Sequence, residues 1–139
     1  MLLVDTNVWL AAADRSSSRH GACAKLIADP TNEPASTVPV IAETAWLLLD
    51  RAGPGAQQRF LAAVAASQIT IIDLTADDWT RVHELVTVYA EASLDIIDAS
   101  TIAAAERLNQ TVIATLDERD FRIVRPAHID AFELLPGPT

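Results

Sequence analysis

Cysteine, histidine and lysine are all scarce in this sequence of 139 residues. The single cysteine, Cys23, excludes an intramolecular disulfide bond and fits a protein of the reducing cytoplasm. Its apolar helical context predicts a buried thiol rather than a nucleophile. The three histidines, His20, His83 and His128, lack the spacing of metal ligands, so a zinc site is not expected. Lys25 is the only lysine, which disfavours phosphatases of the haloacid-dehalogenase type, because these enzymes require a lysine later in the chain.

Long uninterrupted apolar segments are also missing. Half of the residues are apolar, but Asp, Glu and Arg interrupt each apolar segment before it reaches the roughly 20 residues of a membrane span. The first residues lack the basic segment that opens a signal peptide. The length suits a single core, so we expect one cytoplasmic domain, residues 1–139, with no membrane partner.

Positive charge is in short supply as well. The formal net charge is −9, which argues against a nucleic-acid-binding protein because phosphate contacts normally require a basic surface. This objection weakens if acidic side chains surround bound cations, since a metal ion reverses the local charge. Arg119, Arg122 and Arg125 lie within seven residues of one another. They form either a solvated surface or contacts to RNA phosphates, which the guanidinium group matches well.

The order of secondary structure predicts an α/β protein. Short apolar or β-branched segments alternate with longer helical segments. This alternation is typical of a three-layer α/β/α sandwich with a central, mostly parallel sheet. The expected strands are 2–5, 34–38, 69–73 and 112–114, with a late edge strand over 132–135. The expected helices are one that Thr6 or Asn7 caps and that ends near Asp14, one that Thr75 caps, and 20–28, 40–49, 57–66 and 94–108.

Two aspartates follow short buried strands. Asp5 ends the first expected strand, and Asp117 lies just beyond the strand over 112–114. Parallel strands bring their carboxyl ends to one edge of a sheet, where the ligands of open α/β sheets bind. Each aspartate alone has an ordinary explanation as a helix cap. Together they predict an acidic site at that edge.

Two further acids fall on apolar helix faces. Helical spacing puts Glu43 on or beside the face that Val40 marks, and Asp98 lies between Leu94 and Ile102 on one stripe. A carboxylate on a buried stripe is costly unless it is paired, protonated or bound to a metal. Few basic residues are available to neutralise four inward carboxylates, and like charges raise one another's pKa. A divalent cation would solve this problem.

An all-carboxylate site suits Mg²⁺ or Mn²⁺ better than zinc. We expect Asp5 and Asp98 to hold the principal ion, with Glu43 and Asp117 completing the site or holding a second one. Such a site is suited to phosphodiester hydrolysis, because cations activate water and stabilise the leaving oxygen. The secondary candidates are Asp95 and Asp120 as further acids, and Thr6, Asn7 and Thr115 as partners of a ligand carboxylate or a metal-bound water.

Four segments together resemble the motifs of the PIN-domain nucleases, and more closely those of the VapC toxins of bacterial toxin–antitoxin pairs. The segments are Leu3–Asn7, Pro39–Glu43, Leu94–Ser100 and Ala114–Phe121. Each motif alone is weak, but their order and spacing extend over nearly the whole chain. The resemblance implies a PIN sandwich. It matches Asp5, Glu43, Asp98 and Asp117 to the acidic metal-binding positions of the family and Thr115 to its usual hydroxyl.

The same resemblance implies an Mg²⁺- or Mn²⁺-dependent endoribonuclease that acts as the toxin of a VapBC-type pair. It also implies an RNA substrate, homodimerisation, and inhibition by a small cognate VapB-type antitoxin whose C-terminal segment lies across the active-site groove. A housekeeping PIN nuclease of RNA processing is the alternative within the family.

Two alternatives lie outside that family. A haloacid-dehalogenase-type phosphatase also begins with a strand-end aspartate, but it requires a second acid two residues later, where Asn7 stands. A non-enzymatic interaction module would use Trp9, Trp46 and Trp79 as contact anchors. The apolar helical context of these tryptophans favours packing in the core or in a dimer instead.

Overall fold

One parallel sheet organises the chain. Residues 1–138, which the computed structural model describes, contain a five-stranded sheet in the order β3-β2-β1-β4-β5, and every neighbouring pair is parallel. The central strand β1 pairs through Leu3 with Ala35 of β2 and with Ile113 of β4. The strands are β1 (Leu2–Val4), β2 (Pro34–Thr37), β3 (Thr70–Ile72), β4 (Val112–Ala114) and β5 (Glu133–Leu135). Each predicted strand is present, and β5 lies at the edge as expected.

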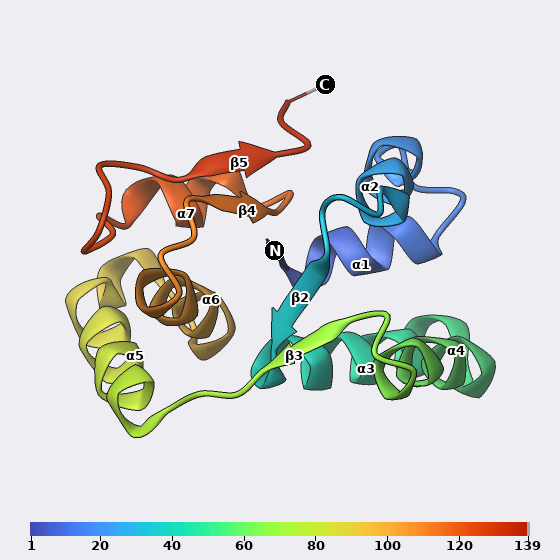
Figure 1. Cartoon of the computed structure of the whole chain (residues 1–139), viewed down its shortest axis with the longest axis horizontal. Helices are drawn as coiled ribbons and strands as arrows, with labels where there is room; N and C mark the ends of the chain where they lie inside the picture. Colours follow the sequence, from blue (N-terminus) through green and yellow to red (C-terminus); the bar gives the residue numbers. More distant parts are fainter. Residues whose placement is uncertain (139) are drawn as a thin grey trace.

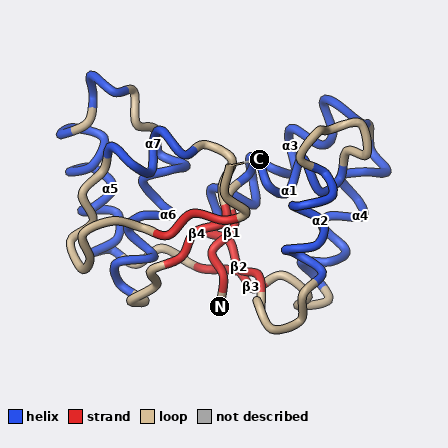
Figure 2. Tube along the Cα trace, turned by 90° about the horizontal axis from the view of Figure 1, so that it is seen from above, coloured by secondary structure: helices blue, strands red, loops and turns tan. Residues whose placement is uncertain are grey.

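Helices cover both faces of the sheet, which confirms the predicted three-layer sandwich (Figure 1). Figure 2 shows the strands as a central layer between the two groups of helices. Strand β1 is buried on both faces, because Leu2 and Val4 pack with one group and Leu3 with the other. The first group is α1 (Thr6–Ala13), α2 (His20–Ala28), α3 (Val38–Ala52) and α4 (Pro54–Ala65), and the second is α5 (Ala76–Val88), α6 (Ile96–Arg107) and α7 (Glu118–Ile123).

Helix starts follow local signals, with one correction. Thr75 caps α5 as predicted, since its hydroxyl accepts from the Asp78 backbone N at 3.1 Å and the Asp78 carboxylate accepts from the Thr75 backbone N at 3.0 Å. The predicted cap of α1 is wrong. Asp5 caps this helix instead of Thr6 or Asn7, and its carboxylate accepts from the Thr6 backbone N at 2.9 Å. Strand β1 therefore turns into α1 at Asp5 itself.

The sequence pattern does not reveal two short helices. These are the 3₁₀ helix Ala90–Ala92 and the six-residue α7, and both are too short to display a helical period of apolar residues. Cys23 is buried in α2, as expected. Trp9 packs in the core, whereas Trp46 and Trp79 are 61% and 47% exposed. Core packing is therefore confirmed for Trp9 alone.

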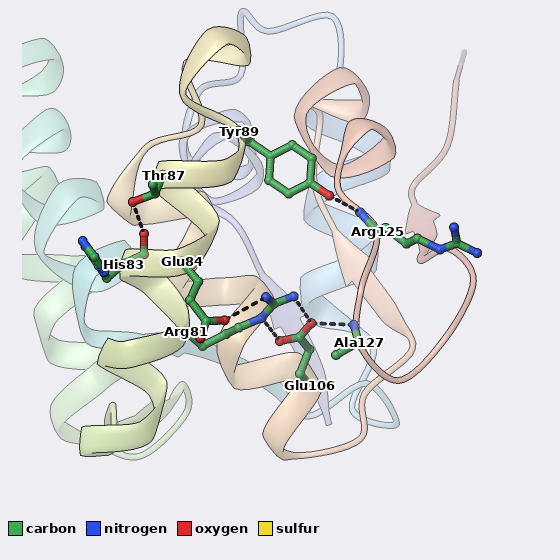
Figure 3. Close-up of polar contacts among 8 residues, drawn as sticks. All are labelled: Arg81, His83, Glu84, Thr87, Tyr89, Glu106, Arg125 and Ala127. Atoms are coloured by element: carbon green, nitrogen blue, oxygen red, sulfur yellow. Dashed lines mark hydrogen bonds and ion pairs between the residues drawn. The ribbon is translucent and has the colours of Figure 1, made fainter.

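Polar contacts fasten α5 and α6 to the segment between α7 and β5 (Figure 3). Glu106 of α6 accepts from Arg81 Nε at 2.7 Å, from Arg81 Nη2 at 3.0 Å and from the Ala127 backbone N at 2.6 Å. The Tyr89 hydroxyl accepts from the Arg125 backbone N at 3.0 Å. Within residues 1–138, no helix is both long and apolar enough to cross a membrane.

Candidate active site

The candidate site lies where the chain changes direction across the sheet. From β1 the chain adds β2 and β3 on one side, and it later adds β4 and β5 on the other. Asp5 follows β1 directly, and Thr115 and Asp117 follow β4. The Asp5 backbone N donates to the Ala114 carbonyl at 2.9 Å, so the two strand ends are held side by side. Ligands of open α/β sheets bind at such a switch point, outside the carboxyl ends of the strands.

Asp5 is a buried carboxylate that receives two hydrogen bonds. Its side chain is enclosed, with the residue 2% exposed. Oδ1 accepts from the Thr6 backbone N and Oδ2 from the Thr115 hydroxyl, each at 2.9 Å. Burial nevertheless raises the pKa of Asp5 to about 6, against the opposing effect of these hydrogen bonds, and the negative charges of Glu43 and Asp117 add to the increase.

Three acids from two helices and the end of β4 converge beside Asp5. One carboxylate oxygen from each of Asp98, Asp117 and Asp120 lies within 4.8 Å of the others. Burial, followed by repulsion from Asp5 and Asp95, raises the pKa of Asp98 far above its usual range. Burial also raises the pKa of Asp117, and the hydrogen bond from the Asp120 backbone N, followed by the positive charge of Arg119, partly opposes this rise. The expected burial of Asp98 on the apolar face of α6 is confirmed.

The donor chemistry of this group fits a hard divalent cation. Among residues 1–138, no ion pair neutralises Asp5, Asp98 or Asp117. Clustered carboxylates without basic partners repel one another, and this repulsion is relieved by protonation or by a cation. Carboxylate oxygens are the ligands that Mg²⁺ and Mn²⁺ prefer. A separate cavity of about 680 Å³ lies at the amino ends of the strands, where Met1, Pro34 and Thr70 line it, and none of these acids lines it.

The remaining acidic candidates lie around this group. Glu43 is half-buried on α3, near enough to raise the pKa of Asp5, but it lies outside the group of three converging oxygens. Asp95 is exposed and caps α6, where it accepts from the Asp98 backbone N at 3.0 Å. Asp120, expected only as a secondary candidate, contributes an oxygen to the cluster. Asp120 is therefore part of the acidic cluster, whereas Glu43 and Asp95 lie at the margin of the cluster.

Of the three polar candidates, Thr115 and Asn7 hold the strand ends in place through their side chains. The Thr115 hydroxyl donates to Asp5 and accepts from the Asp117 backbone N at 3.0 Å, so it links two site acids. Asn7 Oδ1 accepts from the Leu116 backbone N at 2.9 Å and thus fixes the loop after β4 rather than an acid. The Thr6 hydroxyl is buried and has no hydrogen-bond partner within the described part of the chain.

The three predicted RNA-binding arginines have different surroundings. Arg119 lines a pocket of about 390 Å³ together with Asp117. Arg122 is exposed and pairs with Glu118 at 3.5 Å. The Arg125 side chain points away from the contacts drawn in Figure 3. Arg19, which no sequence pattern singles out, also lines the pocket beside Asp117. Its position in a polar loop before α2 gives no periodic signal that would reveal this contact.

The fold and the site together define an α/β/α protein with an acidic cluster at the switch point of a parallel sheet, suited to bind divalent cations. The PIN domain family model matches residues 2–125. The chain therefore belongs to the PIN domain family.

Individual relatives are similar over most of their length. The chain is 27% identical over 135 residues to ribonuclease VapC26 of Mycobacterium tuberculosis (strain ATCC 25618 / H37Rv), covering 97% of this chain and 100% of that protein. The crystal structure of Mycobacterium tuberculosis VapC20, described as a Sarcin-Ricin loop cleaving toxin, has a TM-score of 0.74 at 24% identity and covers 81% of this chain and 87% of that one. VapBC2 of Rickettsia felis bound to a promoter DNA fragment has a TM-score of 0.67 at 21% identity, with 96% of each chain covered.

Proposed function

We propose that this protein is an Mg²⁺- or Mn²⁺-dependent endoribonuclease and the toxin of a VapBC-type toxin–antitoxin pair. The observation that carries the proposal is the convergence of Asp98, Asp117 and Asp120 beside the buried Asp5, with no ion pair to any of these acids among the described residues. Membership of the PIN domain family and the similarity to a protein named ribonuclease VapC26 support the same reaction class.

In this proposal Asp5 and Asp98 hold the principal cation, and Asp117, Asp120 and Glu43 complete the acidic site. When bound, divalent cations neutralise the charge that develops on the scissile phosphate and activate the attacking water. The protein's own part is to position the carboxylates. Thr115 orients Asp5, and the Asp120 backbone N donates to Asp117 Oδ1 at 3.3 Å. Carboxylates held this close together repel one another, and a bound cation would relieve that repulsion.

The toxin role implies partners beyond RNA. One structural neighbour is VapBC2 of Rickettsia felis, and the relative identified by sequence carries the VapC name. We propose by analogy that this chain forms a homodimer and that a small VapB-type antitoxin inhibits it. A housekeeping PIN nuclease would share the RNA cleavage but would not arrest growth on expression or respond to the product of an adjacent short gene.

Cleavage assays with matched variants test the proposal. The wild-type protein is expected to cleave single-stranded RNA only with added Mg²⁺ or Mn²⁺, and Asp5→Asn and Asp98→Asn are expected to reduce the rate by at least about 10³-fold, since each removes a metal ligand. Asp50→Asn on the exposed surface of α3 is the control and should retain activity. If the Asp98→Asn variant cleaves RNA at the wild-type rate, Asp98 has no role in the reaction.

A growth assay separates the toxin from a housekeeping nuclease. Expression of the wild-type chain is expected to stop growth, and either Asp5→Ala or co-expression of a neighbouring small open reading frame should restore it. Normal growth on expression of an enzyme that cleaves RNA in vitro would favour the housekeeping alternative.

A further inference from the structure

A small pocket adjoins the acidic site on the side of the C-terminal segment. Its volume is about 390 Å³. Two arginines from distant parts of the chain line it, Arg19 before α2 and Arg119 in α7. The remaining lining residues are Thr115, Leu116, Asp117, Glu118, Gly137 and Pro138. Because Thr115 and Asp117 belong to both, the pocket and the acidic site share one wall.

The wall of this pocket is fixed by hydrogen bonds. The Leu116 backbone N donates to Asn7, and the Asp117 backbone N donates to the Thr115 hydroxyl, at 2.9 and 3.0 Å. On the opposite side, the Arg19 guanidinium donates through Nη2 to the Gly137 carbonyl. The contact joins residues 118 positions apart, so it holds the arginine at the pocket.

No ion pair within residues 1–138 neutralises the Arg19 guanidinium. Its Nε is also buried without a hydrogen-bond partner among these residues. Arg81 and Arg107 show the contrast, since they pair with Glu106 at 2.7 Å and with Asp78 at 2.9 Å. A half-buried guanidinium without a counter-ion is costly, and an anion in the pocket would offset this cost.

A phosphate is the anion that the surroundings favour. The chain carries a net charge of −9, and its acidic cluster repels RNA wherever cations do not neutralise it. Positive charge next to the cluster would offset that repulsion. Arg119 lines the same pocket as Asp117, so its charge lies at the edge of the site. Guanidinium groups bind phosphate with paired hydrogen bonds.

We propose that Arg19 and Arg119 together bind a backbone phosphate of the RNA strand next to the scissile phosphate. This inference rests on the proposed RNA cleavage and adds a specific strand-binding position to it. It selects Arg119 from the predicted arginine group and excludes Arg122 and Arg125, which do not line the pocket. The contact positions the strand and takes no part in bond cleavage.

Binding of a short fluorescent single-stranded RNA tests the inference. The measurements use the Asp98→Asn background, in which the RNA is not cleaved, and they compare Arg19→Ala, Arg119→Ala and Arg15→Ala. Arg15 is exposed in the same loop as Arg19 and does not line the pocket, so it controls for the loss of one charge. Arg19→Ala and Arg119→Ala should each weaken binding about tenfold. Each should also reduce the slope of the logarithm of the binding constant against the logarithm of the salt concentration by up to about 0.7. Arg15→Ala should change affinity less than about twofold.

Cleavage kinetics in the otherwise wild-type protein provide a second readout. Arg19→Ala should raise KM about tenfold and change kcat by less than about twofold, because the contact is the same in the ground and transition states. Arg19→Lys should recover part of the loss, since it keeps the charge without the paired donors.

Failure of this inference differs from failure of the proposed function. If the wild-type protein cleaves RNA and both arginine variants bind and cleave like Arg15→Ala, the phosphate position is wrong while the nuclease stands. If Arg19→Ala only weakens inhibition by a co-expressed antitoxin, the pocket receives a protein carboxylate, and the inference is overturned. Absence of cleavage by the wild-type protein would instead refute the proposed function itself.

Discussion

The Thr115 hydroxyl donates a 2.9 Å hydrogen bond to the carboxylate of Asp5, joining the ends of β4 and β1 across 110 residues of sequence. The same hydroxyl accepts from the Asp117 backbone N at 3.0 Å. One buried side chain thus sets the position of two acids at the sheet switch point. Its removal would leave Asp5 with a single hydrogen bond, from the Thr6 backbone N.

Thr115→Val tests this positioning role, because valine has nearly the same shape but lacks the hydroxyl. We expect Mn²⁺ affinity and RNA cleavage to fall by about 10–100-fold, the usual effect of losing a residue that orients a metal ligand. Thr115→Ser should retain most of both. Calorimetric Mn²⁺ titration together with kcat measurement checks the prediction. Wild-type metal affinity in Thr115→Val would show that the hydroxyl does not orient Asp5.

Asp98→Asn should have opposite effects on stability and function. Burial and the negative charge of Asp5 make ionised Asp98 unfavourable in the metal-free fold. Removal of that charge should raise the melting temperature of the metal-free protein and reduce the increase that Mn²⁺ produces in the wild type. Thermal unfolding with and without metal measures both effects. A lower melting temperature in the metal-free variant would indicate that the carboxylate is stabilising.

The stability of the metal-free protein should decrease as pH rises through the range in which Asp5 ionises. Its pKa is about 6 in the fold against an ordinary value of 3.8, so the folded state binds the proton more tightly. The stability that Asp5 contributes by binding this proton is complete below pH 3.8, and it is lost as the pH rises through about 6. The raised pKa of Asp98 extends the loss to higher pH. Urea unfolding of the wild type and Asp5→Asn across this range should give a smaller pH dependence for the variant.

The acids at the site could be predicted because their neighbours are unusual. Asp5 follows an apolar strand, and Asp98 interrupts a stripe that Leu94 and Ile102 continue, so both stand out against the solvated acids of other helices. Parallel strand ends place Asp117 near Asp5 without further information. The architecture followed from the same alternation of strands and helices.

The parts that escaped prediction depend on tertiary contacts. Arg19 lies in a polar loop, and only the arrangement of α2 against the C-terminal segment brings it to Asp117. Asp120 is predicted only as a secondary candidate, because a helix of six residues has no periodic signal to show that the first residues of α7 face Asp98. Trp46 resembled a core residue because helix α3 is rich in apolar side chains on several faces, yet it is 61% exposed.

Glu106 should contribute far more to stability than its neighbour Glu84, although both contact Arg81 (Figure 3). The Glu106 side chain is 10% exposed and also accepts from the Ala127 backbone N, whereas Glu84 is 55% exposed. Glu106→Ala should lower the free energy of unfolding by about 1–2 kcal/mol because it removes three hydrogen bonds to a carboxylate, two of them from the partly buried Arg81 guanidinium. Glu84→Ala should lower it by less than about 0.5 kcal/mol. Equal effects in urea unfolding would mean that burial does not distinguish the pairs.

The exposed face of α3 is the surface on which we expect homodimerisation to depend. Val38, Trp46 and Leu49 lie within one side of the helix at 44%, 61% and 40% exposure, and Glu43 of the acidic margin lies on the adjacent side. Exposed tryptophan in such an apolar group is typical of an interface.

Trp46→Ala should therefore weaken self-association by at least about tenfold, the effect of removing an interface anchor worth about 2 kcal/mol. Trp79→Ala on α5 is the matched comparison, since it removes a second exposed tryptophan from another face of the sandwich. Sedimentation across a range of protein concentrations gives the dissociation constants. Dissociation by Trp79→Ala with no effect of Trp46→Ala would move the interface to α5, and a monomer at every concentration would remove the dimer from the proposal.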